Sequence, residues 1–78
     1  MTTVTYKATF ANGTTITRNN HTGRVYTFAW IARTSTYNQA RWGFAVDRKT
    51  AERSARSTFP TKMFDNVTIE IVPAEVVA

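Results

Sequence analysis

RVYTFAWIART, residues 24–34, decides the fold, because both alternating sides of this stretch are apolar. One side carries Tyr26, Phe28, Trp30 and Ala32, and the other carries Val25, Thr27, Ala29 and Ile31. Successive side chains of a β-strand point to opposite faces of its sheet, and a strand that is apolar on both faces is covered on both. We therefore expect residues 24–34 to form a central strand.

The next segment supplies its partner. A polar loop at residues 35–38 precedes RWGFAV, residues 41–46, in which bulky and small residues alternate. The two strands are expected to pair as an antiparallel hairpin. We place the bulky side chains on one face of this hairpin, namely Phe28, Trp30 and Phe44. The opposite face then carries Val25, Ala29, Ile31 and Ala45.

The N-terminal segment predicts another hairpin, because apolar and polar residues alternate over residues 4–10 and an Asn-Gly turn follows. A two-residue turn would pair Thr9 with Ile16 and put Ile16 on the polar face. A three-residue loop with a left-handed Gly13 pairs Ala8 with Ile16 instead. We expect the second register, because it places Ile16 in the core.

Residues 49–58 change to the helical period, with alanine on one side and lysine and arginine on the other. Asp47 and Thr50 are both suitable N-caps, and the sequence leaves both open. The helix is expected to end before Pro60, which cannot continue the hydrogen-bond ladder. Residues 67–72 alternate again and predict the last strand.

The predicted fold is α+β, with a mainly antiparallel sheet of four or five strands in the order ββββαβ, one helix packed on one face, and residues 1–78 in a single domain. A helix of about three turns is only about 17 Å long and covers part of one face. The face with Val25, Ala29, Ile31 and Ala45 then needs cover from loops, from a curled sheet or from another chain. We expect a protein or homodimer interface there, with the loop residue Tyr37 as an exposed aromatic contact.

The composition argues for a protein that works by contact. Its 78 residues include a single histidine, His21, no cysteine and five carboxylates, against ten lysines and arginines, which gives a net charge of +5. We therefore expect no enzymatic activity, no metal or other cofactor and no small-molecule substrate. The N-terminus lacks a signal-peptide pattern and no apolar stretch approaches about 18 residues, so we expect a cytoplasmic protein without a membrane partner.

Positive charge is concentrated in the centre of the chain, where eight basic and two acidic residues lie between residues 18 and 56. Six of these basic residues are candidate contacts for the phosphates of DNA or RNA: Arg24, Arg33, Arg41, Lys49, Arg53 and Arg56. The simpler interpretation is a solvated helix surface, in which Glu52 pairs with arginines four residues away. Nucleic-acid binding is therefore the alternative function, after protein binding.

Three segments carry a family resemblance: ANGTT at residues 11–15, GRVYTFA at residues 23–29, and RWGF at residues 41–44 followed by a helix rich in alanine and arginine. Their succession resembles small uncharacterised proteins encoded by mycobacteriophages and other phages of actinobacteria. The resemblance implies an accessory protein that is made in an infected bacterial cell and binds a host protein. It implies no site residues.

Overall fold

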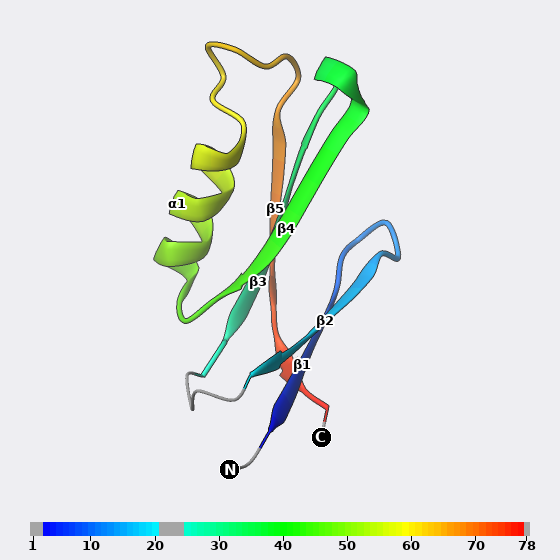
Figure 1. The fold of residues 1–78 in the computed structure, drawn as a ribbon, viewed down its shortest axis with the longest axis vertical. Coiled ribbons are helices and arrows are strands. Elements are labelled where there is room, and N and C mark those ends of the chain that lie inside the picture. The colour runs from blue at the N-terminus through cyan, green and yellow to red at the C-terminus, as the bar shows by residue number, and fades with distance from the viewer. Residues whose placement is uncertain (1–2, 21–24, 78) are drawn as a thin grey trace.

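The computed structural model describes residues 3–20 and 25–77 and shows an α+β fold, with six strands and one α-helix in this part of the chain (Figure 1). In chain order the elements are β1 (Val4–Thr9), β2 (Thr15–Asn20), β3 (Phe28–Thr34), the 3-10 turn η1 (Thr36–Asn38), β4 (Gln39–Ala45), α1 (Arg48–Thr58), β5 (Thr68–Pro73) and β6 (Glu75–Val76). The described strands pair antiparallel in two three-stranded sheets, sheet A with the order β2-β1-β6 and sheet B with the order β4-β3-β5.

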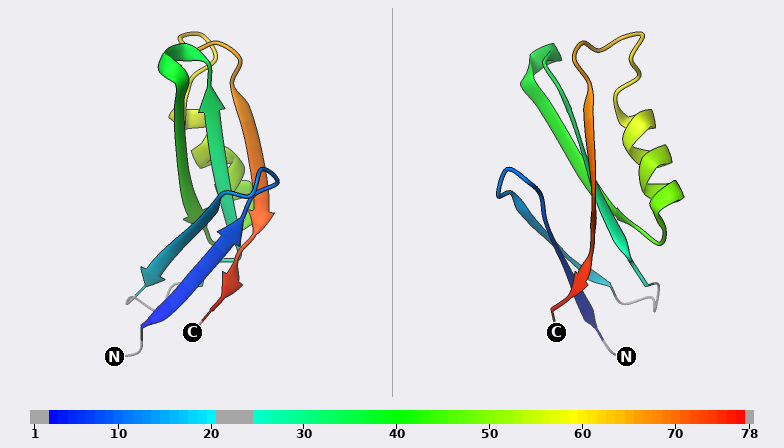
Figure 2. Two further views of the ribbon diagram at one scale, coloured as in Figure 1. Left: turned by 90° about the vertical axis from the view of Figure 1, so that its right-hand side faces the viewer. Right: turned by 180° about the vertical axis from the view of Figure 1, so that it is seen from behind.

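The α+β class is confirmed, whereas the prediction of one sheet of four or five strands in the order ββββαβ is wrong. The cause is the C-terminal segment, which takes part in both sheets. It pairs with β3 as β5, passes Ala74, and then pairs with β1 as β6. The hairpin of β1 and β2 therefore does not extend sheet B, but crosses over one of its faces (Figure 2).

The central strand of sheet B is covered on both faces, so the fold has three layers (Figures 1 and 2). The layer between α1 and sheet B contains Trp30, Ala32, Ala45, Ala51, Ala55 and Phe59. The layer between sheet B and the first hairpin contains Ala8, Phe10, Ile16, Ala29 and Ile31. Ala29 and Ile31, which we expected at an open face, are 0% and 3% exposed. The prediction that this face lacks cover within the chain is therefore wrong, because the first hairpin covers it.

The register of β3 and β4 also corrects the predicted faces of the central hairpin. Trp30 lies opposite Gly43, whereas Phe44 lies opposite Ala29. Phe44 therefore faces the first hairpin and not the helix, and Ala45 is buried on the helix side. A Cβ atom on Gly43 would lie 3.0 Å from three atoms of the Trp30 indole, so the glycine makes room for this ring.

The first hairpin has the predicted register. Ala8 lies opposite Ile16, and Gly13 is left-handed with φ 90°. The tip of the hairpin is fastened to sheet B, because the Ala11 N–H donates a hydrogen bond to Oε2 of Glu70 at 2.7 Å. This bond and the buried side chains of Ala8 and Ile16 hold the hairpin on sheet B.

The ends of two strands differ from the prediction. The central strand begins at Phe28 and not at residue 24, because the Thr27 N–H already donates to the Ala45 carbonyl at 3.0 Å, one residue out of the regular register. Strand β4 runs over Gln39–Ala45 and not over residues 41–46. Residues 21–24, with His21 and Arg24, lie outside the described residues.

Burial of Ile31 under the first hairpin predicts a difference between two isoleucine variants. Ile31→Val should lower the free energy of unfolding by about 0.5–1.5 kcal/mol, because it leaves a small cavity in a closed layer. Ile69→Val, at a more exposed position in β5, should change the free energy of unfolding by less than about 0.5 kcal/mol. Urea denaturation of both variants measures this, and equal midpoints would show that Ile31 is not enclosed.

Candidate interaction surface

The turn η1 and the loop after α1 lie at the end of sheet B away from the chain termini (Figure 1), and each carries a large exposed apolar side chain. Tyr37 in η1 is 88% exposed, Met63 in the loop after α1 is 76% exposed and Trp42 in β4 is 56% exposed. We call these three residues, together with residues 39–41 of β4, the distal surface.

The turn that carries Tyr37 and the loop that carries Met63 are fastened to each other. Asp65 is the centre of this contact: its carbonyl accepts from the Thr34 hydroxyl at 2.6 Å and from the Ser35 N–H at 3.1 Å. The Asp65 N–H in turn donates to the Thr36 hydroxyl at 2.9 Å. The two exposed side chains are therefore presented by loops that support each other.

Tyr37 has an unfavourable backbone conformation. Its φ of 55° and the φ of 51° at Asn38 lie in the left-handed region, which costs about 1–2 kcal/mol for a residue with a Cβ atom. Tyr37 gains no burial in exchange, since its side chain is the most exposed of the large apolar ones. Strain held at an exposed aromatic residue marks a candidate contact site. The prediction that Tyr37 is exposed is confirmed.

Strand β4 is an edge of sheet B, because β3 is its only strand neighbour among the described residues. Its first half is open to solvent, with Ala40, Arg41 and Trp42 exposed and Gln39 half-buried. An edge strand of this kind has backbone N–H and C=O groups without a strand partner.

The alternation of antiparallel pairing shows which backbone groups of β4 these are. The Ala74 N–H donates to the Thr27 carbonyl at 2.9 Å, so the next pair of this ladder, Phe28 with Pro73, is a non-hydrogen-bonded pair. The N–H and C=O groups of Phe28, and of every second residue of β3 after it, therefore point toward β4. The β4 residues paired with them point their own N–H and C=O groups toward β3. The remaining residues of β4 point these groups away from the sheet: Ala40, Trp42 and Phe44.

A shallow groove of about 550 Å³ runs beside this edge, between β4 and the C-terminal end of α1. It is lined by Trp30, Gln39, Ala40, Arg41, Trp42 and Thr58. The lining contains one cation, Arg41, and no carboxylate. The groove is therefore suited to an apolar side chain next to a negative charge.

The residues predicted as a protein interface do not form one surface. Ala29, Ile31 and Ala45 are buried. Val25 is 60% exposed but precedes β3, whereas Tyr37 follows it, so the two lie at opposite ends of that strand. Of the predicted set, Tyr37 alone belongs to the distal surface.

The exposure of Trp42 and Met63 was not predicted from the sequence. Trp42 alternates with small residues as a core residue does, and its exposure follows from its place on an outer strand of sheet B. No local pattern shows that β4 is an outer strand. Met63 lies in a loop of mixed composition. Pro60, which ends the preceding helix, indicates that the residues after it, including Met63, lie in a loop.

The predicted phosphate contacts are divided between surfaces. Arg33 lies opposite Ala40 and Arg41 opposite Ala32, so these two arginines project from opposite faces of sheet B. The helix residues Lys49, Arg53 and Arg56 are exposed and follow one another at a spacing that forms a single stripe. Arg24 lies outside the described residues.

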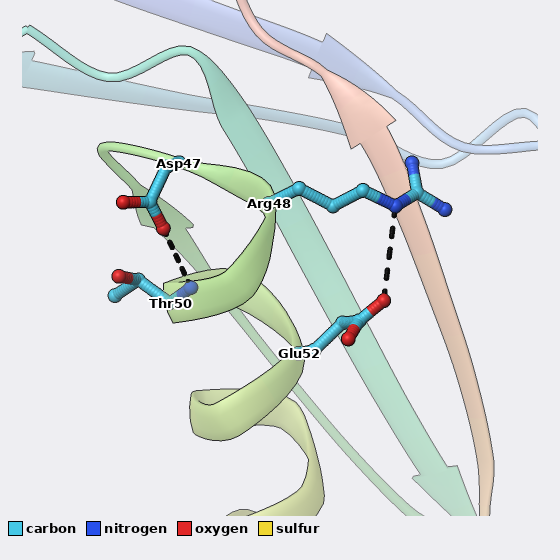
Figure 3. A network of polar contacts seen from close by, with 4 residues as sticks. All are labelled: Asp47, Arg48, Thr50 and Glu52. Carbon is cyan, nitrogen blue, oxygen red and sulfur yellow. Dashed lines mark hydrogen bonds and ion pairs between the residues drawn. The ribbon is translucent and has the colours of Figure 1, made fainter.

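The start of α1 settles the open choice of N-cap. Asp47 is the N-cap, and its Oδ1 accepts from the Thr50 N–H at 2.7 Å (Figure 3). This backbone hydrogen bond lowers the pKa of the Asp47 carboxyl below its ordinary value of 3.8. Arg48, the first residue of α1, contacts Glu52 one turn later, with 3.7 Å between Nε and Oε1, on the side of the helix toward β5 (Figure 3).

Comparison with known proteins returned no match, whether against family models, curated sequences or solved structures. Within residues 3–20 and 25–77, no three histidine or acidic residues gather in a way that could hold a metal ion. The single α-helix of this part of the chain is not a candidate to cross a membrane. The distal surface is therefore judged from its own geometry.

The N-cap predicts a pH-dependent difference in stability. Because folding lowers the pKa of Asp47, its charge stabilises the fold fully above pH 3.8, and this contribution is lost as the pH falls through the lower folded value. Asp47→Ala should therefore unfold at lower urea concentration than the wild type at pH 7, with a gap that narrows below pH 3.8. Asp47→Asn keeps a hydrogen-bond acceptor without the charge, so it should lose less stability than Asp47→Ala. A gap that stays constant down to pH 2 would contradict the lowered pKa.

Proposed function

We propose that the protein is a non-enzymatic binding protein that contacts a partner protein through the distal surface. The observation that carries this proposal is the exposed Trp42 on a free strand edge beside a groove, with exposed Tyr37 and Met63 on two connected loops at the end of the same sheet. Exposed apolar surface on a small domain marks an interaction site.

The residue types favour a protein as the partner. Aromatic residues, methionine and arginine are enriched in protein interfaces, and the residues that dominate their energetics are most often tryptophan, tyrosine and arginine. The distal surface combines these types in Tyr37, Trp42, Met63 and Arg41. Two of them, Tyr37 and Met63, project from loops tied together through Asp65, which reduces the entropy lost on binding.

The resemblance to phage accessory proteins adds the proposal that the partner is a host protein of an infected actinobacterium. In this proposal the chain acts by occupying a surface of the host protein. No site residue is transferred by the resemblance, so the distal surface is argued from the geometry alone.

The test compares recovery of partner proteins from a nuclease-treated mycobacterial lysate by wild type and single variants. Trp42→Ala should reduce recovery of a specific partner at least about tenfold, because loss of one central aromatic contact costs 1.4 kcal/mol or more. Val25→Ala, an exposed residue at the other end of β3, is the matched control and should retain it. A partner recovered equally by both variants would contradict the proposed surface.

Nucleic-acid binding along α1 is the second candidate function. It is favoured by the exposed stripe of Lys49, Arg53 and Arg56 and by the net charge of +5. The stripe retains its charge, because the ion pair found among the described residues joins Glu52 to Arg48 and not to the stripe. Three cations in a row can neutralise successive phosphates of one strand.

Salt dependence separates this candidate from protein binding. If the stripe binds phosphates, the affinity for a single-stranded oligonucleotide should fall with salt with a logarithmic slope of about −2. Arg53→Gln should reduce the magnitude of this slope by about 0.7, whereas Lys7→Gln, an exposed cation of sheet A, should leave it unchanged. Absence of oligonucleotide binding at low salt would exclude the candidate, and fluorescence anisotropy measures both.

A further inference from the structure

We propose that the partner supplies an extended, acidic segment that adds a fourth strand to sheet B along the free edge of β4. This inference rests on the proposed protein-binding function and specifies its mode. It is carried by two independent features of the distal surface, the outward backbone groups of β4 and the charge of the groove beside them.

The backbone of β4 is available for strand addition over its first half. Ala40 and Trp42 turn their N–H and C=O groups away from β3, and both residues are exposed. A peptide placed beside them can form the hydrogen bonds of a sheet ladder, which provide affinity in this mode of recognition. At the other end of β4 the ring of Tyr26 lies against Phe44, with 5.8 Å between their centroids. The added strand is therefore expected to span residues 39–43.

The groove determines the chemistry of the added segment. Alternate side chains of an added strand point to one face of the sheet, and those on the α1 side enter the groove beside Trp30 and Thr58. Arg41 is the only charged residue of the lining, so a carboxylate is the group that it can pair with. In the segment that fits, every second side chain is apolar or acidic and points into the groove, and the side chains between them contact Trp42.

Charge also distinguishes an acidic segment from a second copy of the chain. Pairing of β4 with β4 of another copy would bring together two chains that each carry a net charge of +5. An acidic segment is attracted to the same charge, which speeds its association and disfavours self-pairing. A stable dimer formed through β4 is an outcome of the test that would overturn the proposal.

Ala40→Pro is the variant that separates strand addition from contact by side chains. Proline lacks the N–H that an added strand requires, and the N–H of Ala40 is not used by β3. Gln39, with φ −98° and ψ 150°, already has the extended conformation that a following proline demands. Ala40→Thr keeps the N–H and suits a strand, so it is the matched control. Urea denaturation checks that both variants remain folded.

The probe is a random library of 12-residue peptides, selected for binding to the wild-type chain and counter-selected on Trp42→Ala. We expect the enriched peptides to carry aspartate or glutamate within an alternating, proline-free stretch. Ala40→Pro should weaken binding of the best peptide at least tenfold, whereas Ala40→Thr should bind it with an affinity within a factor of two to three of the wild type. Arg41→Glu should weaken binding of acidic peptides at least tenfold and should strengthen binding of lysine-containing ones. This variant supplies a second test if Ala40→Pro does not fold.

The outcomes separate this inference from the proposed function. Peptides that depend on Trp42 but bind Ala40→Pro as well as the wild type would leave the protein-binding function standing and overturn strand addition. Enriched peptides without acidic residues, or a concentration-dependent dimer that Ala40→Pro dissolves, would also overturn the inference. If no peptide is enriched and Trp42→Ala retains every partner from the lysate, both the strand-addition inference and the proposed protein-binding function are wrong.

Discussion

Burial of β3 on both faces is the constraint on which the rest of the structure depends. Its central residues alternate between the two faces and all are buried: Ala29, Trp30, Ile31 and Ala32. Water must be excluded from both sides of the strand, which requires two covering layers in a chain of 78 residues. The helix α1 provides one layer and the first hairpin provides the other. The C-terminal segment makes this arrangement possible, because it pairs with β3 in sheet B and with β1 in sheet A.

The two covering layers are short, and this leaves the distal surface. The first hairpin ends at Ala11, which is bonded to Glu70, and beyond that point the hairpin face of sheet B is open. Trp42 lies opposite the buried Ile31 yet is exposed, because it occupies the outer strand at the limit of this cover. The core encloses the central strand but not the outer strand β4, whose Trp42 therefore remains in contact with solvent. The candidate binding surface is formed by side chains that the two covering layers leave exposed.

Among the outer strands of the two sheets in the described residues, β2 and β4 differ in a way that bears on function. β2, the outer strand of sheet A, is rich in threonine, asparagine and arginine, as is typical of an edge protected against pairing. Its Arg18 lies over the ring of Tyr26, with 5.5 Å from the guanidinium carbon to the ring centroid, so this side chain is held by the protein itself. β4 instead exposes Trp42 and Arg41 beside a groove. A contrast of this kind within one small chain points to β4 as the edge that meets a partner.

The period of each element is a local property, so the sequence pattern predicted four features: the register of Ala8 with Ile16, a helix that ends near Thr58, the exposure of Tyr37 and the need of β3 for cover on both faces. It did not decide what provides that cover, since a hairpin that adds to a sheet and one that packs across it have the same alternation. The faces of Phe44 and Ala45 likewise depended on the pairing register with β3, and the groove beside Arg41 on the distance between strand and helix. These features arise from contacts between segments far apart in the chain, which local sequence patterns do not specify.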